Sequence, residues 1–315
     1  MSRPSVLIDV DPGIDDALAL VYLARLDCFD LRAITVVAGN TPLDMALSNA
    51  RRVAGVLQMA ADVPIYSGCP KPLLRPLRTA SHIHGPTGLG DLTPPEPPVP
   101  VPSEHAVIAI DRESRAREGE LVVIALGPLT NLAAALVLDP RLAHRVRHLV
   151  FMGGAARVPG NVTEAAEFNA YVDPEALALV VESGIHYTMI GLDVTARTLF
   201  PRERLPELED GDAALQMAQG LLRFYLTVYQ SARGVPGCAL HDPLATAVAA
   251  DPSWVTTEKG RVLVETADEE RLGATTFTPE GSSGGEVATS VRAGEFIDHF
   301  IEVLRDSKRA KGGAP

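Results

Sequence analysis

The chain has 315 residues, and 46% of them are hydrophobic, which is enough for a sizeable core without disulfide bonds. Its formal net charge of −12 argues against nucleic acid or an anionic membrane as a partner, because either would need a basic face. No apolar run reaches the roughly 18 residues of a membrane span, and no room for a signal peptide precedes the first predicted strand. Cys28, Cys69 and Cys238 show no metal-ligand or redox spacing. We therefore expect a cytoplasmic protein with free thiols.

Apolar runs typical of strands alternate with helical patterns along most of the chain, which predicts an α/β fold with an open, mostly parallel sheet and helices on both faces. We expect one domain over residues 1–315. The predicted strands cover residues 5–10, 31–38, 63–67, 121–126, 148–152, 187–192, 260–266 and 274–278. The predicted helices cover residues 15–26, 42–58, 104–117, 129–138, 174–183, 212–232, 242–250 and 294–304. Residues 68–103 are expected to be irregular because they are rich in glycine and proline.

The segment DVDPGIDDALAL, which starts at Asp9, places four carboxylates where the first strand leads into a helix. Asp9 and Asp11 leave the strand by the same face, and Asp15 and Asp16 open the helix, whose N-terminus favours negative charge. The remaining repulsion must raise a pKa or be offset by a hard cation that prefers oxygen ligands. An ordinary strand–turn–helix with acids at the helix start is the simpler interpretation.

Two known types of acidic site in other proteins can be compared with this segment. An EF-hand loop needs glycine at its sixth position and glutamate at its twelfth, but counting from Asp9 these positions hold Ile14 and Leu20. An aspartyl phosphotransferase also has a carboxylate at the end of a buried strand. The acidic residues by themselves therefore do not exclude a phosphotransferase.

Several other polar segments follow predicted strands. Asn40 ends VVAGN, Leu126 and Gly127 lie in LVVIALGPLTN, and Met152 lies in LVFMGGA. Ligands of open α/β sheets bind beyond the carboxyl ends of the strands. The sequence therefore predicts that these segments and the acidic segment meet at one edge of the sheet.

The segment GNVTEAAEFNAYVDPEA carries Asn161, Glu167 and Asn169 before a predicted helix. A polar loop with a helix cap would explain it. Glu167 and Asn169 flank Phe168, however, and this spacing lets both polar groups point the same way beside an aromatic ring. Amides and a carboxylate can bind several hydroxyls of one sugar without adding positive charge.

In CALHDPLATAV, His241 and Asp242 start another predicted helix. Asp242 could be only an N-cap, because aspartate before proline is a common start signal. Beside the acids of the first strand, the same carboxylate becomes a plausible remote metal ligand. His241 could donate or relay a proton there.

Four aromatic or histidine side chains are weaker candidates. His82 and His84 lie in a glycine-rich loop, where a histidine exposed to solvent is the default expectation. Tyr225 and Tyr229 lie four residues apart on one helix face, a spacing more typical of core than of a binding surface. Phenol rings facing a cleft could nevertheless stack on a flat heterocycle.

Together, DVDPGIDDALAL, VAGN, ALGPLTN, FMGG, GNVTEAAEFNAYVDPEA and HDPLA occur in the order and approximate spacing of the inosine–uridine preferring nucleoside hydrolase family, which the chain resembles over nearly its whole length. The resemblance implies a Rossmann-like core, a tightly held Ca²⁺, and hydrolysis of ribonucleosides to ribose and free base. It also implies a homodimer or homotetramer.

The resemblance further implies roles for individual residues. It assigns the Ca²⁺ ligands to Asp11, Asp16, Asp242 and the backbone carbonyl of Leu126. The general base would be Asp11, with Asn40 and His241 completing the catalytic set. The substrate contacts would be made by Asp15, Asn40, Met152, Asn161, Glu167, Asn169 and His241. The family often has threonine at the position of Leu126; because a carbonyl is the ligand, the change should spare the metal. Asp9 receives no role beyond support of its neighbours.

Two alternatives remain from the sequence. A calcium-dependent nucleoside- or ribose-binding protein without activity would share these residues, and a Mg²⁺-dependent aspartyl phosphohydrolase fits less well because Pro12 and Gly13 follow Asp11 directly. Base preference stays open, although His241 favours a broad or pyrimidine-tolerant enzyme.

Overall fold

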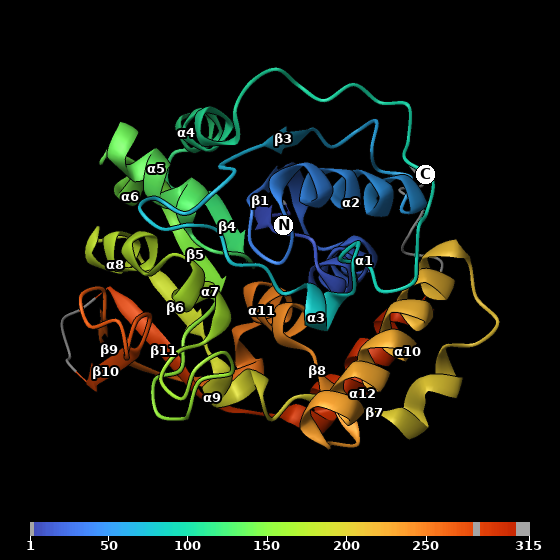
Figure 1. Ribbon diagram of the computed structural model, residues 1–315. Helices are drawn as coiled ribbons and strands as arrows, with labels where there is room; N and C mark the ends of the chain where they lie inside the picture. Colours follow the sequence, from blue (N-terminus) through green and yellow to red (C-terminus); the bar gives the residue numbers. More distant parts are fainter. Residues whose placement is uncertain (1–2, 280–283, 307–315) are drawn as a thin grey trace.

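The computed structural model describes residues 3–279 and 284–306. In this part of the chain, nine strands form one sheet in the order β10-β9-β11-β6-β5-β4-β1-β2-β3 (Figure 1). The strands from β3 to β11 in this order run parallel, whereas β9 and β10 are antiparallel additions at one edge. The strands are β1 Ser5–Val10, β2 Asp30–Val36, β3 Ile65–Ser67, β4 Leu121–Ala125, β5 Val146–Met152, β6 Tyr187–Ile190, β9 Val255–Val264, β10 Thr275–Pro279 and β11 Gly285–Val291.

The order β3-β2-β1-β4-β5-β6 is that of a doubly wound fold, in which the direction of winding reverses between β1 and β4. The predicted fold class is therefore confirmed. A crevice forms at such a reversal because the loops after β1 and β4 leave toward opposite faces of the sheet. The acidic segment follows β1, and Leu126 follows β4, so both lie at this point.

Helices cover both faces of the sheet (Figure 1). The side chains of β1 alternate between them: Val6, Ile8 and Val10 pack into one apolar core, and Leu7 packs into the other. The first core is covered by α1 Ile14–Leu26, α2 Leu43–Val56, α10 Ala213–Arg233, α11 His241–Ala250 and α12 Ala293–Arg305. The second core is covered by α4 Ala106–Ala116, α5 Thr130–Leu138 and α8 Pro174–Glu182.

Short elements connect these layers. Two strands, β7 Leu199–Pro201 and β8 Gly237–Ala239, form a separate antiparallel pair. The short helices are α3 Ser81–His84, α6 Leu142–Arg145, α7 Phe168–Val172, α9 Leu192–Thr195 and the 3₁₀ segments η1 Arg202–Leu208 and η2 Pro252–Trp254. The sequence patterns did not predict these elements, because a single turn or a three-residue strand carries too little periodicity.

The prediction also differs from the structure in two longer regions. The strand β11 was missed because its sequence, GEVATSV, contains few large apolar residues. The strand predicted at residues 260–266 is β9, which already begins at Val255. Within the described residues, none of the three cysteines forms a disulfide bond, as expected. Among the described residues, the helices are too short or too polar to cross a bilayer.

Candidate active site

Asp11 lies just past the carboxyl end of β1, where backbone groups of neighbouring loops surround its carboxylate. Its Oδ2 accepts a 2.6 Å hydrogen bond from the backbone N–H of Asn40. Glycine at two neighbouring positions makes this close approach possible: a Cβ at Gly39 would lie 2.1 Å from Oδ2, and a Cβ at Gly127 would lie 2.6 Å from Oδ1. Asp11 is fully buried, and its Oδ1 has no hydrogen-bond partner in the described part of the chain.

Asp16 fixes the turn between β1 and α1. Its Oδ2 accepts hydrogen bonds from the backbone N–H of Gly13 at 2.9 Å and from Asn40 Nδ2 at 3.2 Å, and its Oδ1 accepts the N–H of Asp11 at 3.1 Å. The turn is therefore locked by the side chain of the third helical residue. This is the role that acids commonly take at a helix N-terminus.

Three carboxylates meet beside this turn. Oxygen atoms of Asp15, Asp16 and Asp242 all lie within 4.8 Å of one another, and all three residues are buried. The helix α11 begins at His241 with Leu240 at its N-cap, so Asp242 is the second helical residue and the N-cap interpretation of this residue is wrong. The group differs from the predicted ligand set, because it contains Asp15, which we had expected on the sugar side, and leaves out Asp11.

Burial and mutual repulsion dominate the electrostatics of these acids. Burial first, and then the charge of Asp16, raises the pKa of Asp11 well above its usual range and that of Asp15 to about 8. Burial and the charge of Asp15 also raise the pKa of Asp242. Within residues 3–279 and 284–306, no lysine or arginine forms an ion pair with Asp11, Asp15, Asp16 or Asp242.

The donor set suits a hard cation. Buried carboxylates without a positive partner are costly, and Asp11 Oδ1 and Asp15 Oδ1 lack any hydrogen-bond donor among the described residues. Carboxylate and carbonyl oxygens are the ligands that Ca²⁺ prefers. Leu126 lines the same pocket as Asp15 and Asp242, and its carbonyl accepts a 2.7 Å hydrogen bond from Asn169 Nδ2.

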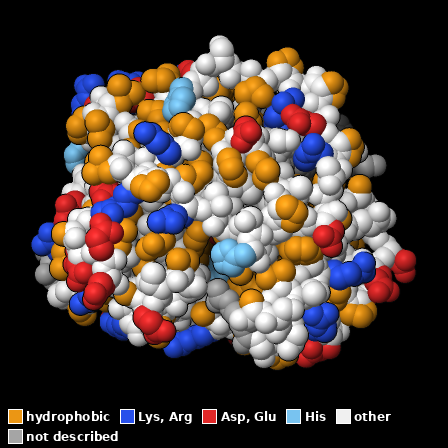
Figure 2. Space-filling model, viewed as in Figure 1, with side chains coloured by type: hydrophobic (Ala, Val, Ile, Leu, Met, Phe, Trp, Pro, Cys, Tyr) orange, Lys and Arg blue, Asp and Glu red, His pale blue; other side chains and the backbone are white. Residues whose placement is uncertain are grey.

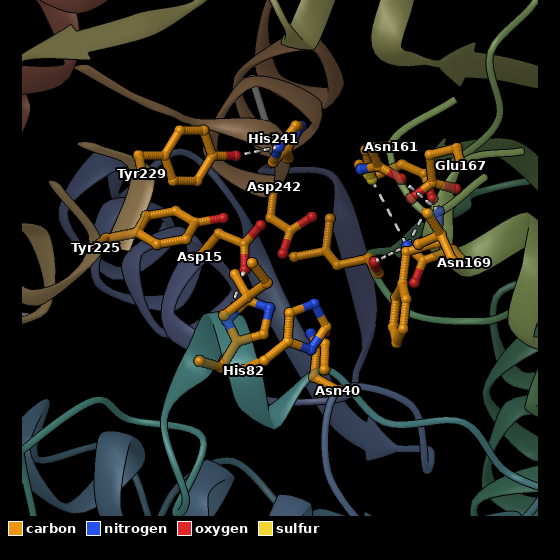
Figure 3. A pocket seen from close by; sticks show the side chains of 17 residues that line it. Asp15, Asn40, His82, Asn161, Glu167, Asn169, Tyr225, Tyr229, His241 and Asp242 are labelled. Carbon is orange, nitrogen blue, oxygen red and sulfur yellow. Dashed lines mark hydrogen bonds and ion pairs between the residues drawn. The ribbon is translucent and has the colours of Figure 1, made fainter. Parts of the chain in front are cut away.

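A pocket opens above the acids, and most of the predicted site residues line it (Figure 3). On the face shown in Figure 2, a histidine side chain stands at the edge of a hollow near the centre. The predicted residues in the lining are Asp15, Asn40, Leu126, Met152, Asn161, Glu167, Asn169, His241 and Asp242. Asp11 and Asp16 are fully buried and are not among the residues that line the pocket. Asp9 bonds instead to Thr35 and Asn131, at 2.5 and 2.8 Å.

One side of the pocket is polar and is formed by the loop before α7. Glu167 caps α7, with Oε2 accepting the N–H groups of Ala170 at 3.1 Å and Gly154 at 2.9 Å. Asn161 Oδ1 accepts the N–H of Phe168 at 2.9 Å. Capping of α7 and binding of a sugar are therefore compatible roles, because the loop before α7 and the first turn of this helix bring Asn161, Glu167 and Asn169 together (Figure 3).

The opposite side of the pocket is aromatic. Tyr225 and Tyr229 of α10 line it, with ring centroids 4.8 Å apart, so their helical spacing serves the pocket as well as the core. The hydroxyl of Tyr229 lies 2.9 Å from His241 Nε2. His82 is exposed and also lines the pocket.

His84 corrects the expectation of a solvated loop histidine. It ends α3 and is only 5% exposed, and its Nδ1 accepts the backbone N–H of Ile14 at 3.0 Å. Burial lowers the pKa of His84 to about 3, so the ring is neutral although Asp15 Oδ1 lies 3.8 Å away. The loop packs against α10, where Phe224 leaves no room for a side chain at Gly90, and this packing could not be read from the loop sequence.

Comparison with known proteins identifies relatives that match most of the chain. The family profile described as "Inosine-uridine preferring nucleoside hydrolase" matches residues 6–298. The inosine-uridine preferring nucleoside hydrolase of Leishmania major is 39% identical over 82% of this chain and 83% of its own length. The pyrimidine-specific ribonucleoside hydrolase RihA of Shewanella woodyi is 36% identical over 98% of this chain and 100% of its own length.

A solved structure agrees with these sequence relatives. The purine-preferring ribonucleoside hydrolase from Gardnerella vaginalis superimposes with a TM-score of 0.91 at 32% identity, covering 98% of this chain and 100% of the other. All three relatives are named as hydrolases, but their names state different base preferences.

Proposed function

The chain belongs to the inosine-uridine preferring nucleoside hydrolase family and is a ribonucleoside hydrolase, and we propose that it depends on Ca²⁺ and uses the pocket described above as its active site. One observation supports this proposal most directly. Buried acids that form no ion pair with a lysine or arginine of the described residues lie where β1 and β4 diverge, between a polar wall suited to a sugar and an aromatic wall suited to a base (Figure 3).

The proposed metal ligands are Asp11, Asp16, Asp242 and the carbonyl of Leu126, and Asp15 lies close enough to join them. When bound there, Ca²⁺ would offset the acids' charge, orient a water and the ribose hydroxyls, and lower the pKa of that water.

Asp11 is the proposed general base. It would accept the proton of the water that attacks C1′ of the ribose, and the hydrogen bond from Asn40 would hold its carboxylate in place. The sugar gains oxocarbenium character as the bond to the base breaks. The acids and amides around it would stabilise this positive charge better than they stabilise the neutral substrate.

The sugar and the base would occupy opposite walls. Asn161, Glu167 and Asn169 would bind ribose hydroxyls, with Asp15, Asn40 and Met152 completing that side. Tyr225, Tyr229 and His241 would face the base, which leaves more readily when it receives a hydrogen bond or a proton. Contacts to the base come from the loop at α3 and from α10, so these segments would set the preference among bases.

A direct test measures ribose release from inosine, uridine, cytidine and adenosine. We expect release from at least one substrate, loss after treatment with EDTA, and recovery on adding Ca²⁺. Binding of labelled nucleoside without release from any member of the panel would favour a binding protein that has lost activity. Release that is unaffected by EDTA would contradict the calcium dependence alone.

The relatives' names do not select one base, so the values of kcat/KM across this panel would define the preference. Cytoplasmic location and assembly as a homodimer or homotetramer remain part of the proposal. Sedimentation of the purified protein would test the assembly.

A further inference from the structure

Thr195 lies directly behind His241, and neither the sequence patterns nor the proposed roles include it. It ends α9 and is fully buried, and its Oγ1 lies 2.8 Å from Nδ1 of the His241 ring. The two residues are 46 positions apart in the sequence. A hydrogen bond over this separation depends on the tertiary fold.

The small β7–β8 sheet sets their relative positions. β7 begins shortly after α9, β8 ends shortly before α11, and Leu199 pairs with Ala239. The backbone N–H of Leu240 then donates to the carbonyl of Thr198 at 3.0 Å. These backbone bonds hold the end of α9 against the start of α11, which is where Thr195 and His241 lie.

Both nitrogens of the His241 ring have hydrogen-bond partners, because Nε2 lies 2.9 Å from the hydroxyl of Tyr229. A neutral imidazole carries one N–H and one lone pair, so two arrangements are possible in principle. In the first, Thr195 donates to Nδ1, and Nε2–H donates to Tyr229. In the second, both directions are reversed.

The burial of Thr195 favours the first arrangement. A buried hydroxyl proton needs an acceptor, and His241 Nδ1 is the hydrogen-bond partner found for this hydroxyl in the described part of the chain. If Thr195 donates, Nδ1 carries the lone pair and Nε2 carries the hydrogen. Nε2–H then donates to the oxygen of Tyr229, and the hydroxyl hydrogen of Tyr229 must point away from His241.

In that direction the hydroxyl of Tyr229 has a second partner, because it hydrogen-bonds to Tyr225, and both tyrosines line the base side of the pocket. The hydrogen bonds thus all run in one direction: Thr195 donates to His241, and His241 donates to the tyrosine side of the pocket. Each hydrogen bond in such a chain strengthens the next.

We propose that Thr195 is a positioning residue that fixes the tautomer and orientation of His241, so that the donor chain ends at the departing base. This inference rests on the proposed function. The electron pair of the C1′–N bond moves onto the base as that bond breaks, and the hydrogen bond from the chain stabilises the charge that develops there. The base takes up a proton from solvent after release. The hydroxyl of Thr195 and the ring of His241 therefore keep their protons.

The test compares two kinds of leaving group. Thr195→Val keeps the shape of the side chain and removes the hydroxyl, and Thr195→Ser keeps the hydroxyl. Inosine and uridine release bases that need a hydrogen bond, whereas 4-nitrophenyl β-D-ribofuranoside releases a stable anion. For Thr195→Val we expect kcat on the nucleosides to fall about 10- to 100-fold with KM changed less than about 3-fold. On the nitrophenyl riboside we expect kcat to change less than about 3-fold.

Thr195→Ser should restore the wild-type ratio of the two activities. Thr246→Val is a matched control, because Thr246 is also fully buried and its hydroxyl has no hydrogen-bond partner among the described residues. It should leave the ratio unchanged. The ratio of the two activities within one sample does not depend on the folded fraction, so partial misfolding of a variant does not affect the result.

An equal loss on both substrates in Thr195→Val would show a merely structural role and would overturn the inference. An unchanged ratio, or failure of Thr195→Ser to restore it, would also contradict it. Wild-type protein that releases ribose from neither substrate class would instead refute the proposed function, and the inference with it. In a His241→Ala background, Thr195→Val should have no further effect on the ratio, because the residue through which it acts is gone.

Discussion

The backbone N–H of Asn40 donates a 2.6 Å hydrogen bond to Oδ2 of Asp11, across a gap that only glycine at position 39 leaves open. Asn40 follows β2 and Asp11 follows β1, so this bond joins the carboxyl ends of two neighbouring parallel strands. It holds the proposed general base in a single orientation.

Replacing Gly39 with alanine should therefore displace Asp11. The new Cβ would lie 2.1 Å from Oδ2, so the carboxylate or the loop must move. We expect kcat on the preferred nucleoside to fall at least about 10-fold and the free energy of unfolding to fall by about 1–3 kcal/mol. Gly294→Ala is the control, because a Cβ there meets no atom within 4 Å. Equal activity of the two variants would contradict the proposed role of the Asn40–Asp11 bond.

Asp11→Ala should abolish measurable turnover, because the water would lose the group that accepts its proton. A general base contributes about 10²- to 10⁴-fold, and loss of a proposed metal ligand would add to this effect. The measurement is kcat on inosine or uridine, with the circular dichroism spectrum as a check of folding. A folded variant with nearly normal kcat would remove Asp11 from the mechanism.

Much of the site could be predicted from the sequence because parallel strands bring their carboxyl ends together. This rule correctly placed Asn40, Leu126 and Met152 beside the acidic segment. The alternation of strands and helices likewise predicted the mostly parallel sheet, but not the order of its strands.

The contacts that the sequence did not predict depend on packing between distant elements. His84 is buried because its loop packs against α10, and Thr195 reaches His241 through the pairing of β7 with β8. Neither contact leaves a periodic pattern near the residue itself. The grouping of Asp15 with Asp242 likewise depends on where α11 begins relative to α1.

Asn169→Ala should weaken ribose binding. Asn169 lines the polar wall, and its Nδ2 also donates to the carbonyls of Leu126 at 2.7 Å and Met152 at 3.2 Å. We expect kcat/KM for a ribonucleoside to fall about 10- to 100-fold, which corresponds to roughly 1.4–2.7 kcal/mol. If kcat/KM for the best nucleoside stayed within a factor of two of wild type, the sugar would have to bind elsewhere.

Removal of the metal should destabilise the folded protein as well as abolish activity, because the buried acids would lose the cation that offsets their repulsion. We expect Ca²⁺ at 100 times its Kd to raise the free energy of unfolding by about 2.7 kcal/mol over EDTA-treated protein. The melting temperature of Asp242→Asn should respond much less to Ca²⁺. An equal response in both proteins would place the ion at another site.

His148 should make the protein sensitive to acid. Burial, and then the neighbouring His186 ring 4.6 Å away, lowers the pKa of His148 to about 4. The usual pKa of histidine is about 6.5, so between pH 6.5 and pH 4 the unfolded chain binds a proton that the folded chain does not. Stability from this group is therefore complete above pH 6.5, is lost as the pH falls toward 4, and then levels off.

His148→Gln should reduce that loss while keeping a group that can hydrogen-bond to Thr188, whose Oγ1 lies 3.0 Å from Nε2 of the native ring. Because solvent reaches part of the half-buried ring, we expect the difference between the two proteins to be about 1–2 kcal/mol over this interval. Urea unfolding at pH 7, 5.5 and 4 measures it, and the exposed His144→Gln serves as the control. Parallel stability curves for wild type and His148→Gln would assign the acid sensitivity to other groups, because a change confined to His148 must alter the slope between these pH values.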